Sequence, residues 1–190
     1  MSKETNAYLN PTLWRTCRAL ANARRLRVFR TLLRENDLTV STVAKRNGIS
    51  EVSATQCLRA LNSRGLLGVR RVSRWVKYRV AHDPSVRVAE EFVSALRLQL
   101  LARGDVIGLT IRDATAFTHP RRIVIFRSLD KHGELSFADL MAITGISEPA
   151  MSRHLMKLKR RRFVYVKNGT WFRGHPKTRM AALLTKLACA

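Results

Sequence analysis

The chain has 190 residues, of which 36 are Lys or Arg and 13 are Asp or Glu, so its formal net charge is +23. Its hydrophobic content of 46% is enough for packed cores and excludes a disordered basic tail. No apolar run approaches the ~20 residues that span a bilayer, and the N-terminal segment lacks the apolar stretch of a signal peptide. We therefore expect a cytoplasmic protein with a polyanionic partner and no membrane association.

The three cysteines do not form a recognisable framework. Cys17, Cys57 and Cys189 are scattered along the chain and odd in number, which fits neither a set of disulfides nor the spacing of metal ligands. We expect reduced thiols, no cofactor and no metal.

The first half of the chain predicts helices followed by a hairpin. Apolar residues recur at helical spacing, Gly48 ends one helix, and Ser50 caps the next one. A basic hairpin turns at 73–74, and Gly65 precedes it. The predicted elements are helices over 11–21, 24–34, 39–46 and 51–64, strands over 66–72 and 75–80, and a long helix over 85–103.

The second half predicts the same order of elements. Gly145 ends a short helix, Ser147 caps the next, and Asn168-Gly169 is a strong signal for a tight hairpin. A turn is expected over 130–134. The predicted elements are helices over 105–117, 120–129 and 137–144, a helix that follows Ser147, strands over 163–167 and 170–173, and a helix over 177–189.

The two halves are related by an ungapped repeat. Arg24-Arg25-Leu26 aligns with Arg121-Arg122-Ile123 at an offset of 97 residues (121 − 24 = 97), and this offset holds from 19–67 to 116–164. A repeat of this length indicates a duplicated domain rather than a solenoid unit. We predict two domains, 1–103 and 104–190, with the long helix in the first.

Positive charge gathers in the same part of each copy. Residues 38–82 hold nine Lys or Arg and one acidic residue, and residues 135–176 hold eight and two. A general excess of positive charge over the surface would not concentrate Lys and Arg in the same part of both copies. We therefore interpret these two basic segments as a duplicated phosphate-binding face.

A short helix, a turn with glycine, a capped helix and a basic hairpin together describe a winged helix-turn-helix. The second helix enters the major groove with small polar and basic side chains, while leucines such as Leu58 and Leu155 anchor it to the core. The hairpin supplies cations to the adjacent phosphate backbone. The predicted fold class is mainly α with small β wings.

The residues of these helices resemble a known family. Ile49-Ser50-Glu51 and Ile146-Ser147-Glu148 begin segments, 49–61 and 146–158, that are similar to the recognition helix of ArsR-like winged-helix transcription regulators. The Arg-Arg-Leu/Ile stretch upstream also matches, so the resemblance covers nearly the whole chain, twice.

The resemblance implies a set of DNA-binding residues. Gln56 suits a bidentate contact with adenine and Arg153 one with guanine. We interpret His154 as a packed or phosphate-contacting residue rather than a metal ligand, because no further ligand is spaced to join it. The remaining candidates are Ser53, Thr55 and Arg59 on the first helix, Arg70, Arg71, Arg74 and Lys77 on the first wing, Ala150, Ser152 and Lys157 on the second helix, and Lys167 and Asn168 on the second wing.

The chain departs from this family in two respects. Many of these regulators sense metals through a Cys-x-Cys pair on the helix before the turn, and neither 40–44 nor 137–141 contains Cys or His. Metal sensing is therefore not expected. The glycine that follows the recognition helix is kept as Gly65 but replaced by Arg162, so the two copies are not equivalent.

Such regulators usually dimerise through their first and last helices, and this chain carries two reading heads. We predict a single-chain pseudo-dimer with an approximate two-fold axis, reading two unlike half-sites. Two independently tethered domains are the alternative, and further pairing of two chains is left open.

The function expected is a sequence-specific regulator of transcription that binds double-stranded DNA. A plasmid-type replication or partition initiator and a non-specific nucleoid architectural protein are the alternatives. An enzyme is not expected, because the sequence has no glycine-rich phosphate loop and no paired-carboxylate site.

Overall fold

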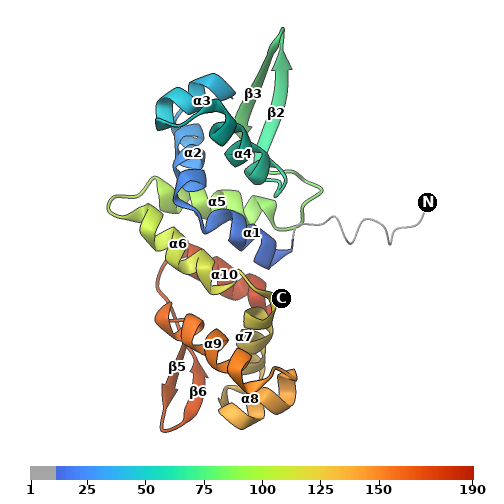
Figure 1. The fold of residues 1–190 in the computed structure, drawn as a ribbon, viewed down its shortest axis with the longest axis vertical. Helices are drawn as coiled ribbons and strands as arrows, with labels where there is room; N and C mark the ends of the chain where they lie inside the picture. The colour runs from blue at the N-terminus through green and yellow to red at the C-terminus, as the bar shows by residue number, and fades with distance from the viewer. Residues whose placement is uncertain (1–11) are drawn as a thin grey trace, which may run out of the picture. The chain divides into compact units, whose positions relative to one another are not determined.

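The computed structural model describes residues 12–190, which form two compact units (Figure 1). Of the described residues, the first unit contains 12 and 22–111, and the second contains 13–21 and 112–190. Helix α1 (Leu13–Leu20) therefore clusters with the second unit, and the first half of α6 (Val106–Ala116) clusters with the first. The predicted division at 103/104 differs from these units at both helices, and the domain boundary itself stays a prediction.

The first unit is a bundle of helices with a three-stranded sheet. Helix α2 packs against α3, α4 and α5, and its buried side chains include Leu26, Phe29 and Leu32. Their spacing of three residues places them on one face of the helix. The elements are α2 (Ala23–Arg34), β1 (Leu38–Thr39), α3 (Val40–Asn47), α4 (Glu51–Asn62), β2 (Leu67–Val72), β3 (Trp75–Val80) and α5 (Ala89–Leu100).

The second unit repeats this arrangement. Three aromatic rings form its centre, with ring centroids 5.2 Å apart for Phe117 and Phe126 and 4.9 Å apart for Phe117 and Phe163, all edge to face. Helix α10 packs on α7. Besides α1 and the end of α6, the elements are α7 (Pro120–His132), β4 (Glu134–Ser136), α8 (Phe137–Thr144), α9 (Glu148–Arg160), β5 (Val164–Lys167), β6 (Thr170–Arg173) and α10 (Arg179–Cys189).

Each sheet has one strand more than the sequence predicted. Both are antiparallel, with strand orders β1-β3-β2 and β4-β6-β5. The extra strands, β1 and β4, pair with the second strand of the hairpin, Leu38 opposite Tyr78 and Leu135 opposite Trp171. A strand of two or three residues is too short to show an alternating pattern. The sequence had accordingly placed Thr39 at the start of a helix and Glu134 at the end of a turn.

Two helices differ from the prediction by three or more residues at one end or both. Helix α5 begins at Ala89 rather than 85, because the Asp83 carboxylate accepts hydrogen bonds from the backbone N–H and the hydroxyl of Ser85 and holds a local turn there. Helix α7 extends to His132 rather than 129, where Gly133 ends it with a φ of 78°.

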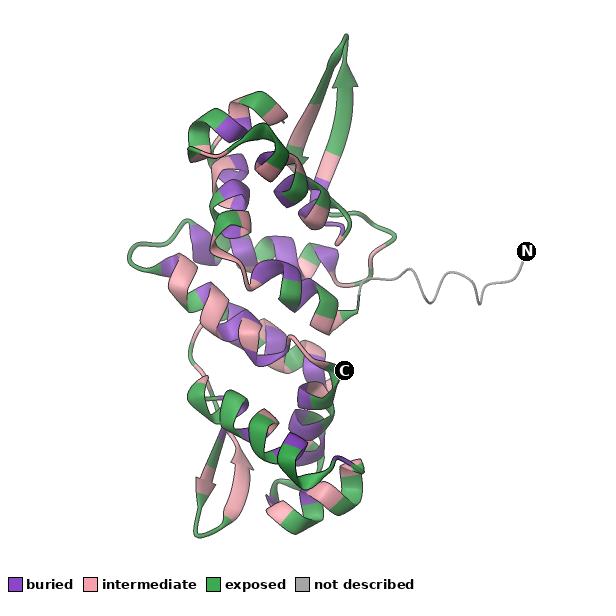
Figure 2. Cartoon of the chain, in the orientation of Figure 1, coloured by how far each residue is buried: buried purple, intermediate pink, exposed green. Residues whose placement is uncertain are grey.

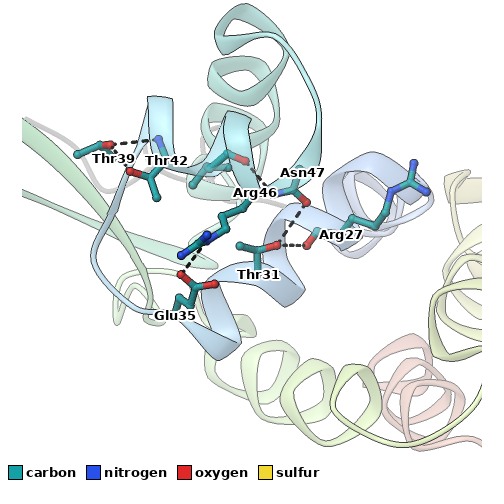
Figure 3. A network of polar contacts seen from close by, with 8 residues as sticks. Arg27, Thr31, Glu35, Thr39, Thr42, Arg46 and Asn47 are labelled. Carbon is teal, nitrogen blue, oxygen red and sulfur yellow. Dashed lines mark hydrogen bonds and ion pairs between the residues drawn. The ribbon is translucent and has the colours of Figure 1, made fainter.

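A polar network holds α3 against α2 in the first unit (Figure 3). The Thr31 hydroxyl donates to Asn47 Oδ1 at 3.3 Å, and Arg46 Nε donates to Glu35 Oε2 at 3.0 Å. The second unit has Ile143 in the place of Arg46, 97 residues on, and Ile143 is exposed. The ion pair made by Arg46 therefore has no counterpart at Ile143 of the second copy.

Candidate nucleic-acid interface

Helix α4 has one buried and one exposed face (Figure 2). Its buried side chains are Ala54, Cys57, Leu58 and Leu61. Among the predicted contact residues, Gln56 and Arg59 are exposed, whereas Ser53 and Thr55 are half-buried.

The N-terminus of α4 is closed by its cap. The Ser50 hydroxyl accepts a hydrogen bond from the backbone N–H of Ser53 at 3.2 Å and donates to the Ser53 hydroxyl at 3.1 Å. The Ser53 side chain is therefore already engaged, and Gln56 and Arg59 are the two predicted contact residues of this helix that are exposed. The single acid of the first turn, Glu51, complements the helix dipole.

Helix α9 exposes Ser152, Arg153 and Lys157 on one side. The Arg153 Nε donates to the carbonyl of Pro149 at 3.1 Å, which fixes the side chain along its own helix. The prediction that Ala150 faces the groove is wrong: Ala150 is 5% exposed. It lies five and eight residues before Leu155 and Leu158, and this spacing places all three on the buried face.

The N-cap of α9 also differs from the prediction. Ser147 occupies the N-cap position, but its side chain accepts no hydrogen bond from the helix. Pro149 lies in the first turn, where its missing N–H costs no helical hydrogen bond.

His154 lies at the edge of the buried face of α9. Its imidazole is half-buried and packs on that of His119, with ring centroids 4.6 Å apart. The pKa of His154 is lowered to about 4, chiefly by burial and then by the neighbouring His119, Arg122, Arg121 and Lys157. His154 is therefore neutral at pH 7.

The first wing is the long hairpin of β2 and β3, largely exposed in Figure 2. Arg71 and Arg74 are exposed, and Lys77 is half-buried. Arg70 is exposed as well, and its Nε and Nη2 donate to the two carboxylate oxygens of Asp37 at 2.9 and 3.0 Å, a contact that the sequence did not predict.

The second wing is shorter, with four residues in each strand. Lys167 and Asn168 are exposed at its end. Asn168 and Gly169 have φ values of 48° and 78°, as a two-residue hairpin turn requires. Tyr165 and Phe172 stack across the strands with ring centroids 5.0 Å apart, which rigidifies this small wing.

A family model described as bacterial regulatory protein, arsR family, matches residues 119–166. This segment is an ArsR-family helix-turn-helix domain. It runs from the N-cap of α7 into β5, and such a domain implies a DNA-binding transcription regulator. No curated protein and no solved structure matches the chain.

Two further properties concern the part of the chain that the structure describes. Between residues 12 and 190, no helix combines the length and the apolar character needed to cross a membrane. In the same range, no three or more His, Cys, Asp or Glu side chains lie together in a way that would hold a metal ion.

Sequence reasoning missed two features near these surfaces. On the first wing, Trp75 is 48% exposed, and the Arg74 guanidinium lies over its ring at 5.3 Å from the centroid. An aromatic residue beside the turn of a basic hairpin was the available signal. In the ArsR-family domain, Arg122 is buried next to the His119–His154 pair, and the sequence had placed it only within a helix.

Proposed function

We propose that the chain is a sequence-specific transcription regulator that binds double-stranded DNA through two recognition helices, α4 and α9, and two basic wings. One observation carries the proposal. In both units, a helix that is apolar on its buried side and polar or basic on its exposed side follows a tight turn and precedes a hairpin.

The exposed residues of the two helices suit different bases. The Gln56 amide carries a donor and an acceptor, which together match N7 and the 6-amino group of adenine. Arg153 uses only Nε in its bond to Pro149, so its two terminal nitrogens are directed to O6 and N7 of guanine. Arg59 and Lys157 then contact phosphate or flanking bases. The two heads read unlike half-sites.

We further propose that the two units form a pseudo-two-fold dimer within one chain. The internal repeat supports this arrangement, because a duplicated domain that dimerises would bring both halves of its dimer into one chain. A pseudo-dimer of this kind recognises half-sites about one helical turn apart. Tethered independent domains would tolerate variable spacing.

The net charge of +23 also favours a second candidate, a non-specific nucleoid architectural protein. Such a protein binds through phosphate contacts, with a steep dependence on salt and little preference for sequence. A replication or partition initiator shares the specific binding but has iterated origin repeats as targets.

The test is selection from a random duplex library at physiological salt, with Gln56→Ala and Arg153→Ala in parallel. We expect a motif of two unlike half-sites at fixed spacing, degraded on one side by each variant, and a loss of about 1–3 kcal/mol for each bidentate contact. The matched control is Met156→Ala on the exposed face of α9, which should leave the motif unchanged. An absence of any enriched motif would instead support the architectural protein.

A further inference from the structure

The guanidinium of Arg122 is buried without a matching negative charge. Arg122 is 4% exposed, and its Nη2 donates to the Thr118 hydroxyl. Its other two nitrogens, Nε and Nη1, are buried and have no hydrogen-bond partner. Among residues 12–190, the salt bridges are made by other arginines, namely Arg46, Arg70, Arg112 and Arg173.

The groups around Arg122 add positive charge and unused polar atoms. The pKa of Arg122 is lowered to about 10, chiefly by burial and then by the repulsion of Arg161. The group is therefore still a cation at neutral pH. Arg161 Nε and His154 Nδ1 are also buried without a partner. A buried charge with unpaired donors destabilises a fold strongly unless a counter-charge joins it.

These groups meet at the N-terminus of α7, a helix of 13 residues. The imidazole of His119 caps the helix, its Nδ1 accepting from the backbone N–H of Arg121 at 3.2 Å. The positive end of the helix dipole therefore points into the same cluster. Within this cluster, Arg122 is buried, whereas His119, His154 and Arg161 around it are half-buried. Solvent therefore reaches the cluster at the three outer residues.

The first repeat holds a matched set of residues at the offset of 97. Asn22, Arg25, Cys57 and Arg64 stand where the second repeat has His119, Arg122, His154 and Arg161. Arg25 and Arg64 each interact with a partner, and Arg25 is only half-buried. The first repeat therefore has arginines at the same two positions without a fully buried guanidinium, and it serves as an internal control.

We infer that the cluster of Arg122, Arg161, His154 and His119 is a binding site for a phosphate-type oxyanion. Such an anion accepts hydrogen bonds from several donors at once and supplies the negative charge that the described residues do not give to Arg122. The oxyanion is either free phosphate or a phosphodiester of bound DNA, because both present the same oxygens. The site is unlike a base-reading surface, since its central cation is buried rather than on the exposed face of α9.

The first arm of the test is equilibrium dialysis of the full chain against radiolabelled inorganic phosphate, in chloride buffer of constant ionic strength. We expect a saturable equivalent of phosphate that is lost in Arg122→Met and kept in Arg25→Met. Both variants remove one positive charge, so a general effect of net charge would act on them equally. Circular dichroism of each variant checks that it is folded, and His154→Gln provides a second variant that leaves the arginine in place and should weaken phosphate binding.

The second arm distinguishes the source of the anion and depends on the proposed function, whereas dialysis does not. If the site takes a DNA phosphodiester, free phosphate does not saturate it, and Arg122→Met reduces the slope of log K against log salt by about one while Arg25→Met does not. The inference is overturned if phosphate binding is absent or unaffected by Arg122→Met and the salt slopes of the two variants are also equal.

Discussion

Arg70 and Asp37 form a bidentate ion pair that joins the first wing to the turn before β1, with N–O distances of 2.9 and 3.0 Å. The two residues are 33 positions apart in the sequence. Arg70 lies opposite Lys77 in the hairpin. The Arg70–Asp37 ion pair therefore holds the hairpin at a position where its second strand also carries a cation. This arginine of the wing therefore anchors the hairpin to the turn before β1.

Replacing Asp37 with Asn should release Arg70 with little effect on stability. Asp37 has a φ of 58°, which Asn tolerates, and both partners of the ion pair are partly exposed. We expect the free energy of unfolding in urea to fall by about 0.5 kcal/mol, as is typical of exposed pairs. DNA binding at low salt should strengthen, and the salt slope should steepen by up to about one, because Arg70 becomes available to phosphate.

The control is the same substitution in an Arg70→Met background. There, Asp37→Asn should leave the salt slope unchanged, since no arginine is released. An equal steepening in both backgrounds would mean that the lost carboxylate acts through the general field of the wing and not through Arg70.

The sequence predicted best the elements that begin and end with strong local signals. Helix α8 and strands β3 and β6 have the predicted bounds, and they adjoin Gly145, which has a φ of 65°, and the turns at Ser73 and Asn168. Helix α5 was predicted too long because its N-cap, Val88, has no side chain that can cap, so local sequence does not mark the start.

The exposure of candidate residues was predictable where helical spacing decides it, as for Gln56 and Arg59. The ion pair of Arg70 was not predictable, because its charge is met by a distant residue, Asp37. The buried state of Arg122 likewise arises from packing within the second unit and not from its neighbours in sequence.

Arg162 is a position where a glycine should stabilise the protein. Its φ of 64° lies in the left-handed region, and the equivalent residue of the first repeat is Gly65, with a φ of 70°. A non-glycine residue with this φ is strained by about 1–2 kcal/mol. Glycine removes the strain, but it also gives the unfolded chain more conformational freedom, which offsets part of the gain in stability. We expect Arg162→Gly to raise the free energy of unfolding by about 0.5–1 kcal/mol.

The reverse change in the first repeat tests the same reasoning. Gly65→Ala should destabilise, because it combines the positive φ with a Cβ only 2.9 Å from the side chain of Val86. Urea denaturation of the two variants measures both effects. If Arg162→Gly is destabilising, the arginine contributes contacts that outweigh its backbone strain.

Leu58 and Leu155 are equivalent anchors of the two recognition helices, and both are fully buried. Replacing either with Ala leaves a cavity in a packed core, so each variant should lose about 2–5 kcal/mol of stability. Urea denaturation followed by circular dichroism measures this loss. Met156→Ala, next to Leu155 but 51% exposed, is the control and should change stability by no more than about 0.5 kcal/mol. A similar loss at Leu155 and Met156 would show that α9 is not packed on the face described.

His154 should make the second unit sensitive to acid. Its folded-state pKa of about 4 lies below the ordinary value of 6.5, so between these values the unfolded chain binds a proton that the folded chain does not. Stability therefore decreases as the pH falls from about 6.5 to about 4 and does not depend on this group above that window. The His119 imidazole, whose pKa is also lowered by burial, acts in the same direction.

The measurement is urea denaturation of the full chain at a series of pH values, together with NMR titration of the histidine Cε1 protons. His154→Gln should flatten the dependence between pH 4 and 6.5, because glutamine keeps a polar side chain but does not titrate. His175, which is exposed, provides the control: His175→Gln should leave the profile of the parent chain intact. A His154 resonance that titrates near 6.5 in the folded protein would contradict the burial of this ring between α7 and α9.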